Sequence, residues 1–299
     1  MREREMKLNK SKKTQILLLL IACMFILFTS GPTFYFTIYS WMSGKNEIQR
    51  ISQLVIHNES NSIKILHNIA DWLDENIEYD QSKSYQFGWL KIRRKIPPNA
   101  QYTVIVKRGA CEEYAVLFKA ISCELGFDCR VIHNPGEDHS WNEVMINGSW
   151  IHFDSTLTSD NRFNNTGHYE RPRFEGGWGK KLSYVFFQDK IGEQYEVTKK
   201  YTNTGTLIIE FNNSKFPIFD IDLIIKSKSL MEWKPDKYKN PIKALKKNNN
   251  DVGQYQLELG GNNYIIVMKW GLFKSNIREY EISLQENEFK TLYVSFARA

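Results

Sequence analysis

The dipeptide Asn147-Gly148 constrains the fold of this chain more than any other short segment. It lies between two runs of strand-forming residues, 140–146 and 149–154. Asn-Gly between two such runs is the strongest short signal for a β-hairpin with a two-residue type I′ turn. The turn also fixes the pairing register, because Ile146 must then face Ser149 and every further pair follows from that one.

The predicted register brings a histidine and an aspartate together at the open end of the hairpin. Trp141 faces Asp154 and, because side chains alternate along a strand, His139, Trp141 and Asp154 share one face. His139 is then the diagonal neighbour of Asp154, at roughly 7–8 Å between backbones, which polar side chains can bridge. An aspartate that orients an imidazole is one half of a catalytic triad. Taken alone, the pair is equally well explained as a surface histidine beside a surface carboxylate.

The candidate nucleophile is Cys111, which directly precedes a predicted helix over residues 112–125 that ends at Gly126. The positive end of a helix dipole favours the thiolate, and the free N–H groups there can stabilise an oxyanion. Glu112 and Glu113 oppose the thiolate, so a further partner is needed. A lone cysteine in this position is also well explained as a small buried apolar residue.

His152 is the rival of His139 as the catalytic base. It lies on the same face of the hairpin, but opposite Glu143 and deeper in the strand pair. This position favours a structural ion pair with Glu143, so His139 is the preferred base.

Four segments around these residues resemble the core of the transglutaminase-like superfamily. Their order and spacing match from about residue 62 to residue 160. The segments are Gly109-Ala-Cys-Glu-Glu-Tyr-Ala, Leu125-Gly-Phe-Asp-Cys-Arg-Val, Asp138-His-Ser-Trp-Asn-Glu-Val and Asn147-Gly-Ser-Trp-Ile-His-Phe-Asp. The resemblance implies a papain-type α+β fold with Cys111, His139 and Asp154 as the catalytic triad.

A narrower likeness links the chain to the peptide:N-glycanase family, amidases that remove N-glycans from asparagine. It rests on residues 138–144 and 150–154 and on Gly177-Trp-Gly-Lys-Lys-Leu-Ser-Tyr-Val. The candidate substrate-binding residues within the matching segments are Trp141, Tyr114 and Trp178. The two C-x-x-C pairs that bind zinc in that family are missing here, so no metal and no cofactor are expected. Their absence also puts recognition of the glycan chain in doubt.

The first residues of the chain predict a membrane anchor. No charged residue occurs from Thr14 to Gly44. Residues 16–28 are purely apolar, and the apolar character resumes at Phe34-Tyr-Phe. A helix of about 20 apolar residues spans a bilayer, so this segment is long enough. Six basic residues precede this segment, so the positive-inside rule predicts a single-pass cell-membrane protein with a cytoplasmic N-terminus and an extracytoplasmic catalytic domain. The alternatives are a lipoprotein box at Leu20-Ile-Ala-Cys and a cleaved signal peptide.

The net charge of +6 does not indicate a nucleic-acid partner. Residues 1–13 hold six basic and two acidic side chains, which gives +4 and leaves 6 − 4 = +2 for the rest. A nucleic-acid binder is expected to spread basic charge over a folded face. The expected partners are a protein, peptide or glycopeptide substrate, and the lipid bilayer through residues 14–41.

The remaining segments set the expected fold class. An apolar repeat of three and four residues predicts a helix over residues 62–77, and 80–102 is expected to be irregular because Pro97-Pro98 opposes regular structure. From residue 204 only strand patterns remain, which indicates an antiparallel β-sandwich of about 95 residues. The expected fold is therefore α+β: a transglutaminase-like catalytic core, then a C-terminal antiparallel β-sandwich, with an N-terminal transmembrane helix. The expected strands are 206–211, 218–225, 254–259, 264–270, 279–284 and 290–296.

Three cysteines follow the apolar segment, namely Cys111, Cys123 and Cys129. Cys123 and Cys129 bracket the helix end at Gly126. A disulfide between them is one expectation; the other is that the short segment between them holds them apart.

The expected organisation has five parts: a basic tail (1–13), an anchor (14–41), a stalk (42–61), a catalytic domain (62–203) and a β-sandwich (204–299). We expect a membrane-anchored amide hydrolase or acyltransferase with a cysteine nucleophile. Its substrate would be a glycosylated asparagine, a glutamine side chain or a peptide bond. Two alternatives stay open: a non-catalytic scaffold module at the cell surface with a vestigial triad, and a cross-linking transglutaminase.

Overall fold

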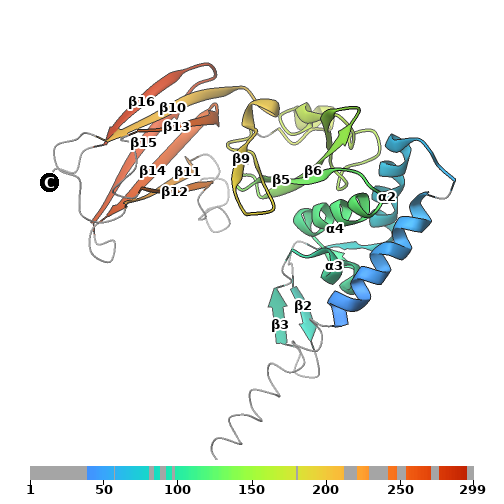
Figure 1. Cartoon of the computed structure of the whole chain (residues 1–299). Helices are drawn as coiled ribbons and strands as arrows, with labels where there is room; N and C mark the ends of the chain where they lie inside the picture. The colour runs from blue at the N-terminus through green and yellow to red at the C-terminus, as the bar shows by residue number, and fades with distance from the viewer. Residues whose placement is uncertain are drawn as a thin grey trace, which may run out of the picture. The chain divides into compact units, whose positions relative to one another are not determined.

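The structure is a computed structural model (Figure 1) that describes residues 39–56, 58–80, 84–87, 92–95, 98–179, 181–211, 221–228, 242–247, 254–270 and 276–294. The chain divides into two compact units, one up to Leu125 and one from Gly126. This division falls at a different place from the expected limit between residues 203 and 204. The expected domain limits stay predictions.

The first unit is mainly helical. It holds a helix over residues 39–56, α2 (Ser62–Asn76), α3 (Ala100–Val106) and α4 (Cys111–Glu124). Helices α2 and α3 both pack against α4 (Figure 1). The helix expected from the apolar repeat is confirmed as α2, and the helix expected after Cys111 is confirmed as α4. Helix α2 begins where the Asn61 side chain accepts the N–H groups of Ile63 and Lys64.

The segment between α2 and α3 is more regular than expected. Strand β1 (Glu78–Tyr79) pairs in parallel with β4 (Arg108–Gly109), and β2 (Ser84–Phe87) pairs antiparallel with β3 (Ile92–Lys95). The expectation of an irregular stretch over residues 80–102 is therefore wrong. Pro97 and Pro98 lie between β3 and α3 in the sequence, so they separate two elements and do not prevent either of them.

The expected single-pass membrane location is contradicted. Among the helices of the described residues, none combines the length and the apolar character that crossing a bilayer requires. Residues 1–13 and most of the expected anchor, 14–38, lie outside the described residues. Residues 39–41, expected to end the anchor, and residues 42–56 of the expected stalk are helical.

The helix over residues 39–56 buries one face against its own unit. Its buried positions recur at three- and four-residue steps, which is the period of one helical face. They are Ser40, Gly44, Ile48, Ile51, Ser52 and Val55. At Gly44 the contact with α3 is so close that a Cβ atom would lie 2.6 Å from the Gln101 carbonyl oxygen. This buried stripe shows that the helix packs on one face within the first unit.

The second unit begins with an antiparallel sheet in the strand order β7-β6-β5-β8-β9. Its strands are β5 (Cys129–Asn134), β6 (His139–Ile146), β7 (Ser149–Phe153), β8 (Phe186–Gln188) and β9 (Gln194–Glu196). A buried cluster of Ile132, Trp141, Tyr169, Leu182, Val185 and Tyr201 ties this sheet to the long segment between β7 and β8.

Two further sheets follow, as the strand patterns after residue 204 predicted. One has the order β13-β10-β16, from β13 (Gln254–Gly260), β10 (Thr204–Phe211) and β16 (Phe289–Val294), which run side by side in Figure 1. The other has the order β12-β11-β14-β15, from β12 (Lys243–Lys247), β11 (Ile221–Ser227), β14 (Asn262–Trp270) and β15 (Asn276–Leu284). One buried cluster draws side chains from both sheets. The pairing is antiparallel except between β10 and β16, which run parallel.

The expected Cys123–Cys129 disulfide is absent. Neither cysteine is in a disulfide; Cys123 is exposed near the end of α4, and Cys129 is buried at the start of β5. The alternative, that the short segment holds the two cysteines apart, is the one the structure adopts. Gly126 ends the helix with a φ of +84°, a conformation that only glycine adopts readily.

Candidate functional site

The hairpin that carries the candidate base has the predicted turn and register. Asn147 and Gly148 have φ angles of 50° and 79°, as the two central residues of a type I′ turn require. Ile146 pairs with Ser149, and Glu143 pairs with His152. The register predicted from the Asn-Gly dipeptide is confirmed.

Asp154, directly after β7, is a fully buried carboxylate with four hydrogen bonds. Its Oδ2 atom lies 2.7 Å from His139 Nε2 and accepts a bond of 3.0 Å from the Tyr169 hydroxyl. Its Oδ1 atom accepts bonds of 2.9 Å and 2.7 Å from the backbone N–H and the hydroxyl of Thr156. Each lone-pair direction of the carboxylate therefore meets a donor, which holds the group in one orientation.

Two opposing effects act on the pKa of Asp154. Burial by itself would raise the pKa of this carboxyl. The imidazole of His139 and the hydrogen bonds that the carboxylate accepts outweigh burial, so the pKa lies below its ordinary value. The group is therefore ionised at neutral pH. A buried carboxylate of this kind stabilises a positive charge on the neighbouring imidazole.

His139 is held at the first position of β6 by the turn before it and by aromatic rings around it. Asp138 has a φ of 53°, so the chain enters the strand from a left-handed conformation. The ring centroid of His139 lies 4.4 Å from that of Trp178, edge-on, and 5.6 Å from that of Trp141. Trp178 is half-buried, whereas Trp141 is only 1% exposed and packs inside the unit. Of the two candidate substrate-binding tryptophans, only Trp178 presents surface to solvent.

Cys111 is the first residue of α4 and is buried. Glu113 turns back to the helix start, where its Oε2 atom accepts the N–H of Ala110 at 2.9 Å. Gly109 is required just before, because a Cβ atom there would lie 2.4 Å from Glu113 Cβ. The Gly-Ala-Cys-Glu-Glu segment thus forms a closed helix start with the thiol on its first residue.

Tyr114, a third candidate substrate-binding residue, lies one turn further along α4 and is buried. Its hydroxyl donates to the Ile77 carbonyl at 2.5 Å, and burial raises its pKa to about 12. Tyr114 thus joins α4 to the end of α2 within the first unit. Among the candidate residues, the structure brings together His139, Asp154, Trp141 and Trp178 in the second unit, while Cys111 and Tyr114 belong to the first.

His152 pairs with Glu143 in the register, but the expected ion pair between them is wrong. His152 Nε2 lies 2.8 Å from the Tyr169 hydroxyl, and Nδ1 accepts the Asn165 N–H at 3.3 Å. Burial lowers the pKa of His152 to about 4, so the ring is neutral at physiological pH. Backbone register sets which residues face each other, but the side-chain partners of His152 come from the segment after β7.

Three residues near the site were not found from the sequence. Thr156 had a local signal, since an Asp whose side chain accepts the N–H two residues later is a common turn pattern. Tyr169 and His168 had none, because they lie in the irregular segment after β7. His168 is 3% exposed, and neither of its ring nitrogens has a hydrogen-bond partner. Its edge faces the ring of Trp178 at 6.1 Å between centroids.

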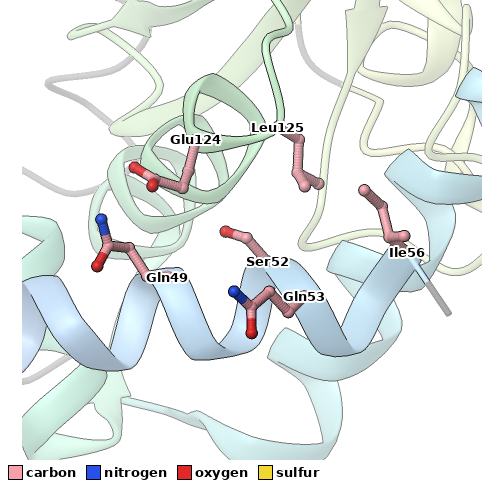
Figure 2. Close-up of a pocket in the computed structure, with 6 residues that line it drawn as sticks. All are labelled: Gln49, Ser52, Gln53, Ile56, Glu124 and Leu125. Atoms are coloured by element: carbon pink, nitrogen blue, oxygen red, sulfur yellow. The ribbon is translucent and has the colours of Figure 1, made fainter.

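A separate cavity of about 470 Å³ lies in the first unit between the helix over residues 39–56 and the end of α4 (Figure 2). It is lined by Gln49, Ser52, Gln53, Ile56, Glu124 and Leu125. None of the candidate residues lies in this lining. In the part of the chain that the structure describes, no group of three or more His, Cys, Asp or Glu side chains is arranged to hold a metal ion.

Comparisons with known proteins agree with the motifs. The family model described as the transglutaminase-like superfamily matches residues 49–155. The "Peptide-N(4)-(N-acetyl-beta-glucosaminyl)asparagine amidase" of Arabidopsis thaliana is 36% identical over 102 residues, which are 33% of this chain and 13% of that protein. The protein of the same name from Yarrowia lipolytica is 37% identical over 99 residues, 32% of this chain and 24% of that protein.

The matched stretch therefore spans less than a quarter of each of these two relatives. A solved structure, "Crystal structure of a TGase", covers 40% of this chain and 33% of that chain at 13% identity, with a TM-score of 0.32, which is too low to bear on the assignment. The assignment rests on the sequence matches: residues 49–155 match the transglutaminase-like superfamily model, and about a third of the chain resembles the peptide:N-glycanase amidases.

Proposed function

We propose that this chain is a cysteine-dependent amide hydrolase in which Cys111 is the nucleophile, His139 the proton carrier and Asp154 the carboxylate that orients His139. The observation that carries the proposal is the 2.7 Å bond between His139 Nε2 and a fully buried, four-fold hydrogen-bonded Asp154. All three residues lie inside the stretch that matches the superfamily model.

The proposed reaction is acyl transfer through a thioester. Because His139 Nε2 donates to Asp154, the ring's basic lone pair is on Nδ1, which takes the proton from the Cys111 thiol. The thiolate attacks the amide carbonyl carbon, and N–H groups at the start of α4 stabilise the oxyanion. The C–N bond then breaks as His139 protonates the leaving nitrogen. Water, deprotonated by His139, cleaves the thioester and restores the thiol.

The substrate contacts that we propose follow from exposure. Trp178 is half-buried with its ring 4.4 Å from that of His139, which supports a direct contact with the substrate beside the reacting amide. Trp141 and Tyr114 are 1% and 3% exposed, so we propose that they act by positioning their neighbours. We further propose that residues 204–299 form a β-sandwich, supported by the buried cluster that both sheets share.

A glycosylated asparagine is the substrate to test first, because the curated relatives are named as amidases of that linkage. The full chain is incubated separately with an N-glycosylated peptide, a glutaminyl peptide and an unmodified peptide. Mass spectrometry follows deglycosylation to aspartate, ammonia release and chain cleavage. An added primary amine detects cross-linking.

The matched control is a pair of cysteine variants. Cys111→Ser should abolish turnover, whereas Cys123→Ser, which alters an exposed thiol on the same helix, should leave it unchanged. Turnover by Cys111→Ser at the rate of the unchanged chain would refute the proposed nucleophile. No turnover on any substrate, with no preferential alkylation of Cys111, would support the scaffold alternative.

A further inference from the structure

A second histidine is connected to the candidate triad through a tyrosine hydroxyl. Asp154 Oδ2 accepts bonds from His139 Nε2 on one side and from the Tyr169 hydroxyl on the other, at 2.7 Å and 3.0 Å. The same hydroxyl lies 2.8 Å from His152 Nε2. These residues are all buried and all belong to the second unit.

The number of protons and lone pairs on each group fixes which partner donates in each of these hydrogen bonds. An ionised carboxylate only accepts, so the single Tyr169 proton must point to Asp154. The Tyr169 oxygen then has only lone pairs to offer His152, so His152 Nε2 must carry a proton. His152 Nδ1 in turn accepts the Asn165 N–H at 3.3 Å, which makes the ring neutral. Protons therefore point in one direction, from Asn165 through His152 and Tyr169 to Asp154.

The surroundings keep this arrangement in place. Burial holds the pKa of His152 near 4, so the ring does not take a second proton in the physiological range. The Tyr169 ring is packed against Trp141 and Trp178, at 4.8 Å and 5.2 Å between centroids. The other ionisable groups that act on His152 are His139, Glu143 and Lys200, and Arg171 acts on the neighbouring His168.

We propose that Tyr169 and His152 are positioning residues of the amide hydrolase, which set the orientation and the effective charge of Asp154 and through it the basicity of His139. The effect on catalysis rests on the proposed function, whereas the hydrogen bonds among these residues do not depend on it. The hydrogen bond from Tyr169 partly neutralises the negative charge on Asp154 Oδ2, the atom that also binds His139. Removing that donor leaves more charge facing His139 and stabilises its protonated form.

The test uses the full chain with ¹⁵N-labelled histidines. In the unchanged protein, His152 should remain the neutral Nε2–H tautomer from pH 5 to pH 8. Tyr169→Phe keeps the ring and its packing and removes only the hydroxyl. It should raise the apparent pKa of His139 by about half a unit or more. The matched control is Tyr201→Phe, the same change in the same aromatic cluster, because the Tyr201 hydroxyl donates to Glu143 and not to Asp154.

Turnover gives the second readout. Tyr169→Phe should lower kcat about tenfold, as expected for one lost bond to a charged group, with KM nearly unchanged and the acid limb of the pH profile moved upward with the His139 titration. An Nδ1–H tautomer of His152, or a His139 titration that Tyr169→Phe does not move, overturns the proposal. A shifted titration in a chain without turnover upholds the hydrogen-bond chain and refutes only the proposed enzyme activity.

Discussion

Asp154 and Glu143 are buried carboxylates of the same hairpin, yet their surroundings differ in kind. Glu143 is bound by two cations, through Arg130 Nε at 2.8 Å and through Lys200 Nζ, and by the Tyr201 hydroxyl at 2.7 Å. Within the described part of the chain, the Asp154 carboxylate accepts no hydrogen bond from a lysine or arginine side chain; its partners are an imidazole, two hydroxyls and a backbone N–H.

The difference separates a structural carboxylate from one suited to catalysis. Burial tends to raise the pKa of both carboxyls. In each case the hydrogen-bonding and charged partners have the larger effect, so the pKa is lowered. The cations at Glu143 stay charged at physiological pH, so this ion cluster has one state. The imidazole at Asp154 changes its charge when it accepts a proton, so this pair has two states of similar geometry. A buried carboxylate supports proton transfer only where its partner can titrate.

The largest effect expected from this comparison is on turnover. Asp154→Asn keeps the size and the Thr156 bonds but presents an amide to His139, so the hydrolysis rate should fall by about 10⁴-fold. Glu143→Gln is the matched carboxylate-to-amide change in the same hairpin and should cost less than about tenfold. Initial rates on the active substrate measure both. Equal losses in the two variants would remove the distinction between the carboxylates.

Glu137, a third buried carboxyl, sharpens the comparison because its partners are neutral. It accepts bonds from the Ser183 hydroxyl and N–H, and burial raises its pKa to about 7. From about pH 5 to pH 7 the unfolded chain has lost this proton while the folded chain keeps it, so stability should fall as the pH rises. The loss is on the order of 3 kcal/mol at most.

Glu137→Gln should remove that slope, because glutamine does not titrate. Its amide oxygen can accept the Ser183 N–H while its NH₂ group donates to the Ser183 hydroxyl. Urea unfolding at pH 5 and pH 8 measures the free energy of unfolding of both proteins. Asp154 contributes with the opposite sign, since its pKa is lowered and its contribution is lost only as the pH falls below its ordinary range. An unchanged slope in Glu137→Gln would show that another group produces it.

A smaller effect, on stability alone, is expected at Glu143. Glu143→Gln leaves Arg130 and Lys200 without a counter-charge, but their side chains are 17% and 34% exposed and water compensates in part. The free energy of unfolding should fall by about 2 kcal/mol at pH 7. Urea denaturation measures it, with Arg50→Ala as an exposed ion-pair control that should cost under about 0.5 kcal/mol. A loss at Glu143 no larger than at Arg50 would contradict a structural role.

The smallest expected effect tests the proposed thiol. Limiting iodoacetamide near pH 6 should alkylate Cys111 before Cys123 and Cys129, and His139→Ala should slow that reaction about tenfold or more. His152→Ala should slow it much less, because His152 would act only through Tyr169 and Asp154. Peptide mapping by mass spectrometry gives the rate at each cysteine. If His152→Ala stops the labelling and His139→Ala does not, the base has been assigned to the wrong histidine.

The sequence by itself determined the parts of this protein that depend on local rules. Asn147-Gly148 set the turn and the register, because few residues adopt its two positive φ angles, and the register then brought His139 to Asp154. An apolar repeat set α2, and Gly126 set the end of α4. These features need no knowledge of distant residues, since turn geometry and helical periodicity act within a few positions.

Only the tertiary structure decided which side chains contact Asp154 and His152 in the hairpin. Tyr169 reaches Asp154 and His152 from an irregular segment 15 residues beyond Asp154, and no period or motif marks it. The same limit explains the errors. The helix over residues 39–56 packs closely on Gln101 of α3, a contact that composition does not reveal. Burial and side-chain pairing are properties of contacts between segments, so a sequence read along one dimension leaves them open.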